Sequence, residues 1–163
     1  MTTDASRRKL ISIVTPCYNE AENVEECHRA IRELFDGELA DFDFEHIFSD
    51  NASTDTTPEI LKRMAAADRR VKVILNARNF GPFRSDFNGL LRAKGDAVLV
   101  LFAADQQDPP DVLPEMVRRW QEGYEVVYGI RANREDRCRF ATRPSTFRRR
   151  TRRPQSDRCG VDR

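Results

Sequence analysis

The stretch AVLVLFAADQQDPPD, residues 97–111, contains the side chains of this chain that are best suited to bind a metal ion. An apolar run ends there in acidic and amide side chains, namely Asp105, Gln106, Gln107 and Asp108. Carboxylate and carboxamide oxygens are the ligands that Mg²⁺ and Mn²⁺ prefer. The same residues would also suit an ordinary polar loop leading into a helix, and this stretch alone leaves both interpretations open.

The apolar run from Ala97 to Phe102 predicts the element that positions these side chains. Its length and composition indicate a central strand buried on both faces. In open α/β sheets, ligands bind at the carboxyl ends of the strands. The polar residues that follow the run are therefore expected at a binding edge.

Strand and helix patterns alternate along the rest of the chain. Further strands are predicted at 10–15, where Pro16 would stop the strand, and at 42–49, 71–75 and 125–128. Helices are predicted at about 21–35, 58–67 and 85–93, and from 113 up to Gly123. This alternation predicts a doubly wound, mostly parallel sheet with right-handed crossovers.

In such a sheet the loops that follow the strands lie side by side at one edge. Four of these loops are polar or contain glycine: PCYNE, DNASTD, NARNFG and AADQQD. Their convergence favours a ligand site over a simple polar loop. By contrast His28 and His46 lack a partner at metal-ligand spacing, and we expect both to be structural.

The amino terminus and the cysteines bear on the compartment. The start, MTTDASRRKL, lacks the apolar segment of a signal peptide, and the longest apolar run is too short to span a bilayer. The four cysteines have no metal-type spacing, so reduced thiols are expected. We expect a cytoplasmic location, either free or peripheral at the inner face of the membrane.

Four motifs now support a resemblance. SIVTPCYNEAENV, FSDNASTDTT, ARNFGPF and AADQQDPPD resemble, in order and spacing, the motifs of family 2 glycosyltransferases. The most similar branch contains dolichyl-phosphate mannose synthase and bacterial polyprenyl-phosphate sugar transferases, and the resemblance covers about residues 9–136. It implies the GT-A fold, a Rossmann-like nucleotide-sugar domain.

The resemblance also implies a reaction and its partners. The donor would be a UDP- or GDP-sugar, the cofactor Mg²⁺ or Mn²⁺, and the acceptor polyprenyl phosphate or a cell-envelope glycan. No nucleic-acid partner is expected. The residues that the resemblance assigns to the donor and its metal are Pro16, Tyr18, Glu20, Asp50, Asp105 and Gln107. The first three would line the base and ribose, Asp50 would bond to the nucleoside, and the last two would hold the cation.

Two positions depart from the family's pattern. The metal motif is usually Asp-x-Asp, but its first position here is Ala103. A site with one carboxylate fewer still suits Mg²⁺, which keeps several waters, although we expect weaker binding. Asn51 stands where the family often has a second Asp after Asp50, an exchange that keeps a polar acceptor.

Transfer of a sugar leaves negative charge on the departing diphosphate, and cations or arginines stabilise it. Candidate catalytic residues are therefore Asp105, Arg131 and Arg134, with Arg78 as a further donor-binding residue. A solvated charged turn is the alternative interpretation of Arg131 and Arg134. A phosphate acceptor, whose second pKa is about 6, needs no general base. A sugar hydroxyl would need one, and no clear carboxylate precedes residue 137.

The chain changes character at about residue 136. Residues 1–136 contain 18 Lys or Arg and 25 Asp or Glu, a net charge of −7. Residues 137–163 contain 10 Arg, no Lys and 2 Asp, a net charge of +8, and show no helix or strand period. We therefore expect disorder in residues 1–8 and 137–163, and an α/β domain over 9–136 that is incomplete at its carboxyl end.

The Arg-rich segment leaves alternatives open. It resembles translation in a shifted reading frame, and on that interpretation the chain binds its donor but transfers sugar poorly. The alternative is a genuine basic tail that binds anionic membrane or nucleic acid. Besides an active sugar transferase, two function classes thus remain: a non-catalytic nucleotide-sugar-binding fragment, and a nucleic-acid or membrane binder acting through the tail.

Overall fold

The computed structural model describes residues 7–100, 104, 110–131 and 147–150 of the chain. It divides into two compact units, Met1–Asp111 and Val112–Arg163, and each is described by itself.

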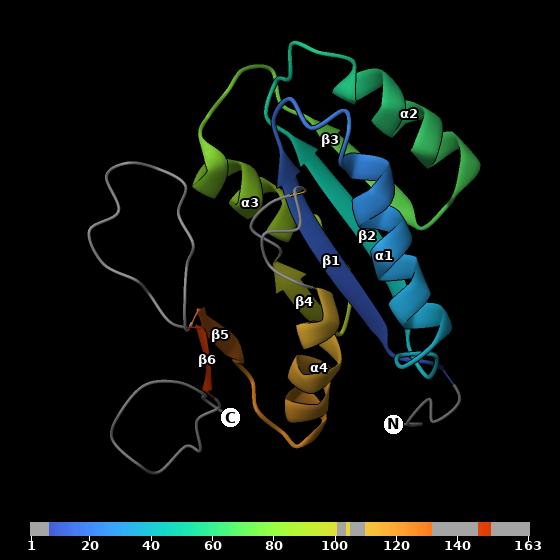
Figure 1. Cartoon of the computed structure of the whole chain (residues 1–163), viewed down its shortest axis with the longest axis vertical. Helices are drawn as coiled ribbons and strands as arrows, with labels where there is room; N and C mark the ends of the chain where they lie inside the picture. Colours follow the sequence, from blue (N-terminus) through green and yellow to red (C-terminus); the bar gives the residue numbers. More distant parts are fainter. Residues whose placement is uncertain (1–6, 101–103, 105–109, 132–146, 151–163) are drawn as a thin grey trace, which may run out of the picture. The chain divides into compact units, whose positions relative to one another are not determined.

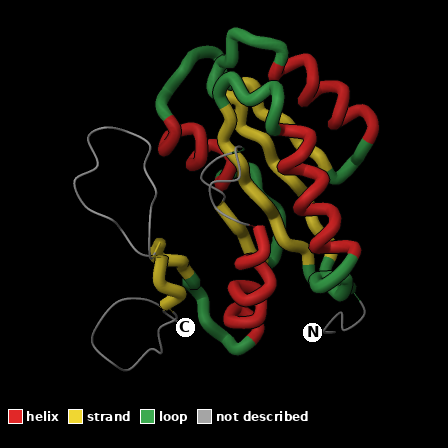
Figure 2. Tube along the Cα trace, viewed as in Figure 1, coloured by secondary structure: helices red, strands yellow, loops and turns green. Residues whose placement is uncertain are grey.

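The first unit is built on a four-stranded parallel sheet (Figures 1 and 2). Its strands are β1 (Leu10–Cys17), β2 (Asp43–Asp50), β3 (Val71–Leu75) and β4 (Ala97–Val100), in the order β3-β2-β1-β4. All pairings are parallel, with Ile11 opposite both Phe44 and Ala97. The parallel α/β architecture expected from the sequence is confirmed.

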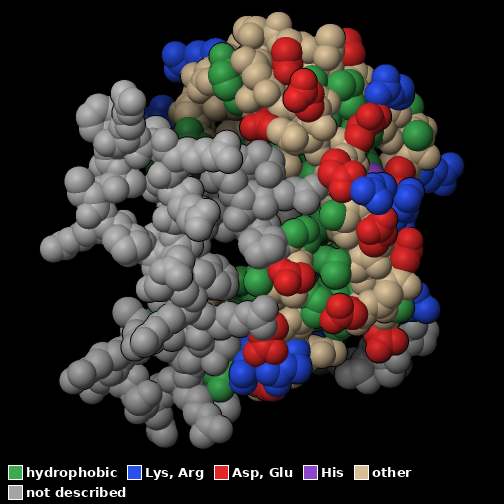
Figure 3. Space-filling view, viewed as in Figure 1, with side chains coloured by type: hydrophobic (Ala, Val, Ile, Leu, Met, Phe, Trp, Pro, Cys, Tyr) green, Lys and Arg blue, Asp and Glu red, His purple; other side chains and the backbone are tan. Residues whose placement is uncertain are grey.

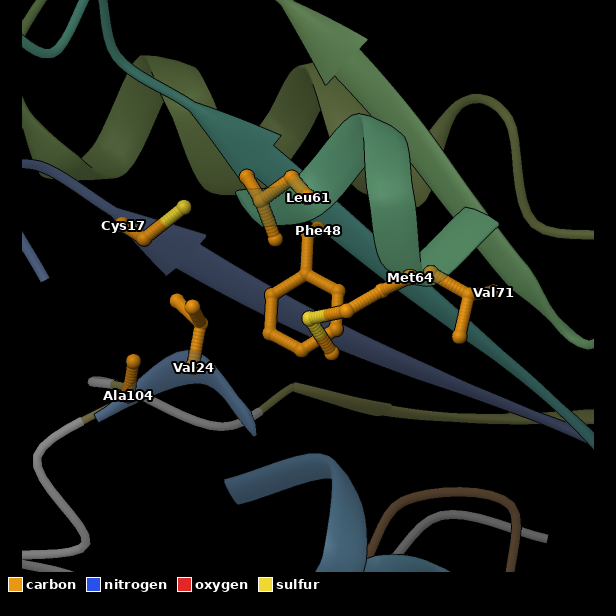
Figure 4. Packing of buried hydrophobic residues seen from close by; sticks show 7 residues of the cluster. All are labelled: Cys17, Val24, Phe48, Leu61, Met64, Val71 and Ala104. Carbon is orange, nitrogen blue, oxygen red and sulfur yellow. The ribbon is translucent and has the colours of Figure 1, made fainter. Parts of the chain in front are cut away.

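Helices cover both faces of this sheet (Figure 1). They are α1 (Val24–Asp36), α2 (Thr57–Ala67) and α3 (Pro82–Leu90). Successive side chains of a strand point to opposite faces. Phe48 therefore packs with Leu61 and Met64 of α2, whereas its neighbour Ser49 bonds to Ser85 of α3. Figure 4 shows Phe48 between β2 and the side chains of α2.

The first two helices follow the expected pattern of a buried apolar stripe and a charged outer face. In α1, Val24, Ile31 and Phe35 are buried, and Gly37 follows its last turn as expected. In α2, Pro58 lies in the first turn, where its missing N–H costs nothing. The space-filling view in Figure 3 shows acidic and basic side chains over these helices.

Two expectations about the strands are wrong. Pro16 does not stop β1, because it lies inside the strand opposite Ser49 of β2. Within the described residues β4 pairs with β1 only as far as Val14, so a proline beyond that point breaks no observed ladder with β4. Nor is β4 a central strand buried on both faces. Among the described strands it lies at the sheet's edge, and Val100 is exposed.

The second unit contains a short 3₁₀ turn (Pro110–Val112), α4 (Leu113–Gln121) and an antiparallel pair, β5 (Tyr128–Arg131) and β6 (Phe147–Arg150). The fifth strand thus forms three residues later than predicted. It belongs to a separate sheet and not to the parallel one. β6 lies in the Arg-rich segment, where no strand was expected. Alternating apolar and polar residues are absent from FRRR, so period-2 reasoning could not find it. The boundaries at residues 8 and 136 stay predictions.

Two further findings concern the helices and the cysteines among the described residues. None of their helices combines the length and the apolar character needed to cross a bilayer. Cys17 and Cys27 are free, buried thiols, and burial raises the pKa of the Cys17 thiol well above its usual range. A buried thiol with a raised pKa is chemically inert.

The two histidines join α1 to the sheet through a buried chain of hydrogen bonds. The Nδ1 atoms of His28 and His46 lie 3.1 Å apart, and His46 Nε2 lies 3.0 Å from Thr15 Oγ1. His28 Nε2 lies 3.4 Å from a carboxylate oxygen of Asp68, which also pairs with Arg70. The expectation that both histidines are structural agrees with this burial and bonding.

Candidate functional site

The carboxyl ends of β1, β2 and β3 lie at one edge of the sheet, because the strands are parallel (Figure 1). Cys17 is opposite Asp50, and Asp50 is opposite Leu75. Ala104, which opens the fourth loop, belongs to the same buried cluster as Cys17 and Val24 (Figure 4). The start of the motif that contains Asp105 is thereby brought to this edge.

Hydrogen bonds hold the first and second loops together. Asn19 adopts a positive φ of 56°, a conformation that Asn tolerates better than most residues. Its N–H donates to Ser53 Oγ at 2.9 Å, and its Oδ1 accepts the N–H of Thr54 at 2.8 Å. The N–H of Glu20 donates to Thr57 Oγ1 at 2.9 Å. The two loops therefore form one bonded unit.

Asp50 is the most buried acidic residue of this edge, with 1% of its surface exposed. Its carboxylate accepts the N–H of Ser53 at 3.1 Å and a short hydrogen bond from the Ser53 hydroxyl. Its own carbonyl accepts the N–H of Asn76 at 2.9 Å, which fixes the start of the third loop. An ionised carboxylate has about four acceptor positions. The bonds from Ser53 use two, so the group can support the loop and accept a further donor.

Asn51 fixes the third loop. Its Nδ2 donates to Asn79 Oδ1 at 2.9 Å, and its Oδ1 accepts the N–H of Phe80 at 2.8 Å. Asn79 Oδ1 also accepts the N–H of Gly81 at 2.9 Å. An Asp at position 51 would lack the donor to Asn79. The departure at Asn51 therefore does more than keep a polar acceptor.

The remaining expected donor residues differ in accessibility. Pro16 is buried inside β1, Glu20 is half-buried and bonded to Asn23, and Tyr18 is 44% exposed. The guanidinium of Arg78 lies over the ring of Phe80, 4.7 Å from its centroid. An arginine held in this way keeps its N–H donors available at the edge.

Asp105, Gln107, Arg134 and the departure at Ala103 lie outside the described residues. Arg131 is in β5, of which only the backbone is described there. The part of the chain that the structure does describe contains no group of three His, Cys, Asp or Glu side chains suited to a metal.

Sequence reasoning missed the residues that bond the loops to one another, chiefly Asn19, Ser53, Asn51 and Asn79. A signal for them was present. The density of Asn, Ser, Thr and Asp in PCYNE, DNASTD and NARNFG is typical of side chains that bond to neighbouring backbone groups.

The chain is similar in sequence to known proteins. The curated relatives include the uncharacterized glycosyltransferase YkcC of Bacillus subtilis, 38% identical over 135 residues, which cover 83% of this chain and 41% of the relative. Another is the undecaprenyl-phosphate 4-deoxy-4-formamido-L-arabinose transferase of Pseudomonas syringae. It is 38% identical over 130 residues, covering 78% of this chain and 37% of the relative. The chain thus spans about two fifths of the length of these relatives.

A solved structure shares the fold. The mannosyltransferase PcManGT of Pyrobaculum calidifontis, in complex with GDP-Man and Mn²⁺, matches with a TM-score of 0.56 and 26% identity. The match covers 72% of this chain and 34% of that one. The sequence model of the family described as glycosyl transferase family 2 matches residues 12–161. This match, the relatives and the parallel sheet agree with the resemblance, and the chain belongs to glycosyltransferase family 2.

Proposed function

We propose that this chain forms the donor-binding part of an enzyme that transfers a sugar from a UDP- or GDP-sugar to polyprenyl phosphate or a cell-envelope glycan. The observation that carries the proposal is the buried Asp50 at the end of β2, surrounded by bonded loops from three strands. Ligands of α/β sheets bind at such an edge. The relative from Pseudomonas syringae, named for undecaprenyl phosphate, supports the lipid acceptor.

In this proposal the residues of the edge have separate tasks. Asp50 accepts a hydrogen bond from the nucleoside, with Tyr18 and Glu20 beside the base and ribose and Pro16 packed beneath them. Arg78 donates to the diphosphate. Asp105 and Gln107 would supply oxygen ligands for Mg²⁺ or Mn²⁺, and the charge of such an ion would stabilise a leaving diphosphate. Arg131 and Arg134 are proposed to add positive charge there.

The first test is metal-dependent donor binding, because a cation held by Asp105 and Gln107 would attract the negatively charged diphosphate of the donor. Calorimetry with UDP- and GDP-sugars should show binding that requires Mg²⁺ or Mn²⁺. Asp105→Ala should abolish this requirement, while Asp111→Ala, a change at an exposed carboxylate nearby, should keep it. Equal binding in the presence and absence of a chelator would refute the metal role.

A second test concerns Asp50. Asp50→Ala should weaken nucleotide binding by on the order of 1–3 kcal/mol, because a buried nucleoside donor loses its acceptor. Ser53→Ala is the control, since it removes the hydroxyl that bonds to the Asp50 carboxylate and to the N–H of Asn19 but leaves the carboxylate in place. An equal loss of affinity in both variants would mean that Asp50 acts only by shaping the second loop.

A further inference from the structure

Helix α3 exposes the kind of side chain that the other helices of its unit bury. α1 buries Val24 and Ile31 and places salt-bridged residues such as Arg29 outside. α3 buries Ser85 and Gly89, while Phe83 is 78% and Phe87 is 59% exposed. Its apolar face thus points away from the sheet.

The inner face of α3 explains why these phenylalanines do not pack against the sheet. A Cβ at Gly89 would lie 2.5 Å from Val14 Cγ1, so the helix approaches β1 too closely for a larger side chain. The Ser85 hydroxyl lies 2.9 Å from the Ser49 hydroxyl and donates to the Ser49 carbonyl at 3.0 Å. Small and polar groups dock α3 on the sheet, and its outer phenylalanines contribute little to that packing.

Five of the exposed apolar residues lie on α3 or directly beside it in the sequence, and we call these five the α3 surface. Its members, with exposed fractions, are Phe80 (38%), Phe83 (78%), Phe87 (59%), Leu90 (38%) and Leu91 (67%). From Phe83 onward they recur at steps of four, three and one, which is the spacing of one helical face. Exposed apolar residues gathered in this way mark an interaction site.

Positive charge flanks the α3 surface. Residues 76–95 contain four basic side chains, Arg78, Arg84, Arg92 and Lys94, all exposed, and one acid, the half-buried Asp86. This local excess of basic residues contrasts with the net charge of −7 over residues 1–136. The guanidinium of Arg78 also lies over Phe80, within the set. The partner that fits therefore has an apolar interior and an anionic face.

We propose that the α3 surface docks on an anionic lipid bilayer, with its phenylalanines in the acyl-chain boundary and Arg84, Arg92 and Lys94 at the headgroups. Phe and Leu beside Lys and Arg are the composition of interfacial helices, and each basic residue near an anionic leaflet adds attraction. A symmetric pair of two copies would place the same positive charges face to face. The charges thus favour a lipid surface over a second copy, and the proposal stands independently of sugar transfer.

The test is co-sedimentation of the full chain with phosphatidylcholine vesicles that contain or lack phosphatidylglycerol. The Arg-rich residues 137–163 can attract anionic vesicles by charge alone, so binding is measured at low and at high salt. Salt screens charge attraction but leaves apolar insertion. At high salt, the double variant Phe83→Ser, Phe87→Ser should bind the vesicles about tenfold more weakly or worse. Each phenylalanine that inserts into the bilayer removes apolar surface from water, and the variant loses that favourable free energy.

Controls make the outcome decisive. Val126→Ser changes an exposed apolar residue elsewhere and should bind vesicles like the unchanged chain. Phe83→Trp reports directly on insertion of this position into the bilayer. Brominated lipid should quench the tryptophan fluorescence of this variant more than it quenches the fluorescence of Trp120 in the unchanged chain. Equal high-salt binding by the double serine variant, or no added quenching in Phe83→Trp, would overturn the proposal. So would a concentration-dependent dimer that the double variant abolishes.

Discussion

Lowering the pH from 7 to 5 is expected to reduce the free energy of unfolding through the buried His46. Burial holds the pKa of the His46 ring well below its usual value of 6.5, and the neighbouring His28 lowers it further. Burial also lowers the pKa of His28, against the opposing effect of Asp68. The unfolded chain therefore binds more protons below pH 6.5, so stability is lost as the pH falls.

Asp86 changes stability in the opposite direction over the same range. Burial raises the pKa of its carboxyl from 3.8 to about 6, and its Oδ1 finds no hydrogen-bond partner among the described residues. Between pH 6 and 3.8 the folded chain therefore binds more protons at Asp86 than the unfolded chain does. The contribution of Asp86 to the free energy of unfolding consequently increases as the pH falls. Urea unfolding at pH 7, 6 and 5 should consequently show a larger acid loss in Asp86→Asn than in the unchanged chain.

A variant at His46 separates the histidine effect from general acid sensitivity. His46→Leu should be less stable at pH 7, because Thr15 and His28 lose a buried partner. Its stability should nevertheless depend less on pH than that of the unchanged chain. An unchanged pH dependence in His46→Leu would contradict the assignment.

Gly95→Ala is expected to lower the free energy of unfolding by on the order of 3 kcal/mol. A Cβ at this position would lie 2.6 Å from the backbone N of Ser12 and 2.7 Å from the carbonyl oxygen of Ala97. Both atoms belong to the backbone of paired strands, so these two clashes cannot be relieved by rotation of a side chain. The shift would also disturb the N–H of Gly95, which donates to Ser12 Oγ at 2.8 Å.

Gly81→Ala is the matched control for this substitution. Its φ of +85° disfavours a side chain, but no atom lies within 4 Å of the added Cβ. With ψ at 161° this backbone conformation is one that essentially only glycine adopts, so a loss of about 1–3 kcal/mol is expected from backbone strain alone. A denaturation midpoint of Gly95→Ala equal to that of the unchanged chain would contradict the close packing at Gly95.

The first unit could be predicted from the sequence because its signals are local. The β-branched run at 10–15 and the apolar stripe of α1 each indicate their own element, and alternation then implies a parallel sheet. By contrast, whether Pro16 lies inside β1 depends on which strands flank β1. Whether β4 is exposed depends on its place in the sheet. Those are properties of tertiary pairing, which no short window of sequence contains.

The sequence predicted where the candidate site lies, but not which hydrogen bonds hold its loops together. Converging loops indicated the edge and Asp50, while the bonds from Asn19 to Ser53 and from Asn51 to Asn79 join residues about thirty positions apart. Such pairs become visible only once the strands are aligned. The antiparallel pairing of β5 with β6 was missed for the same reason, since β6 lies in a distant segment that shows no strand pattern.

The bonds between the first two loops have a consequence for the entropy of association. Fixing one residue's backbone costs about 1–2 kcal/mol at room temperature. In this protein Asn19, Glu20, Ser53 and Thr54 are already fixed by one another when the domain folds. A nucleotide arriving at this edge would not have to order those loops, so the free energy of its contacts would not be reduced by that cost.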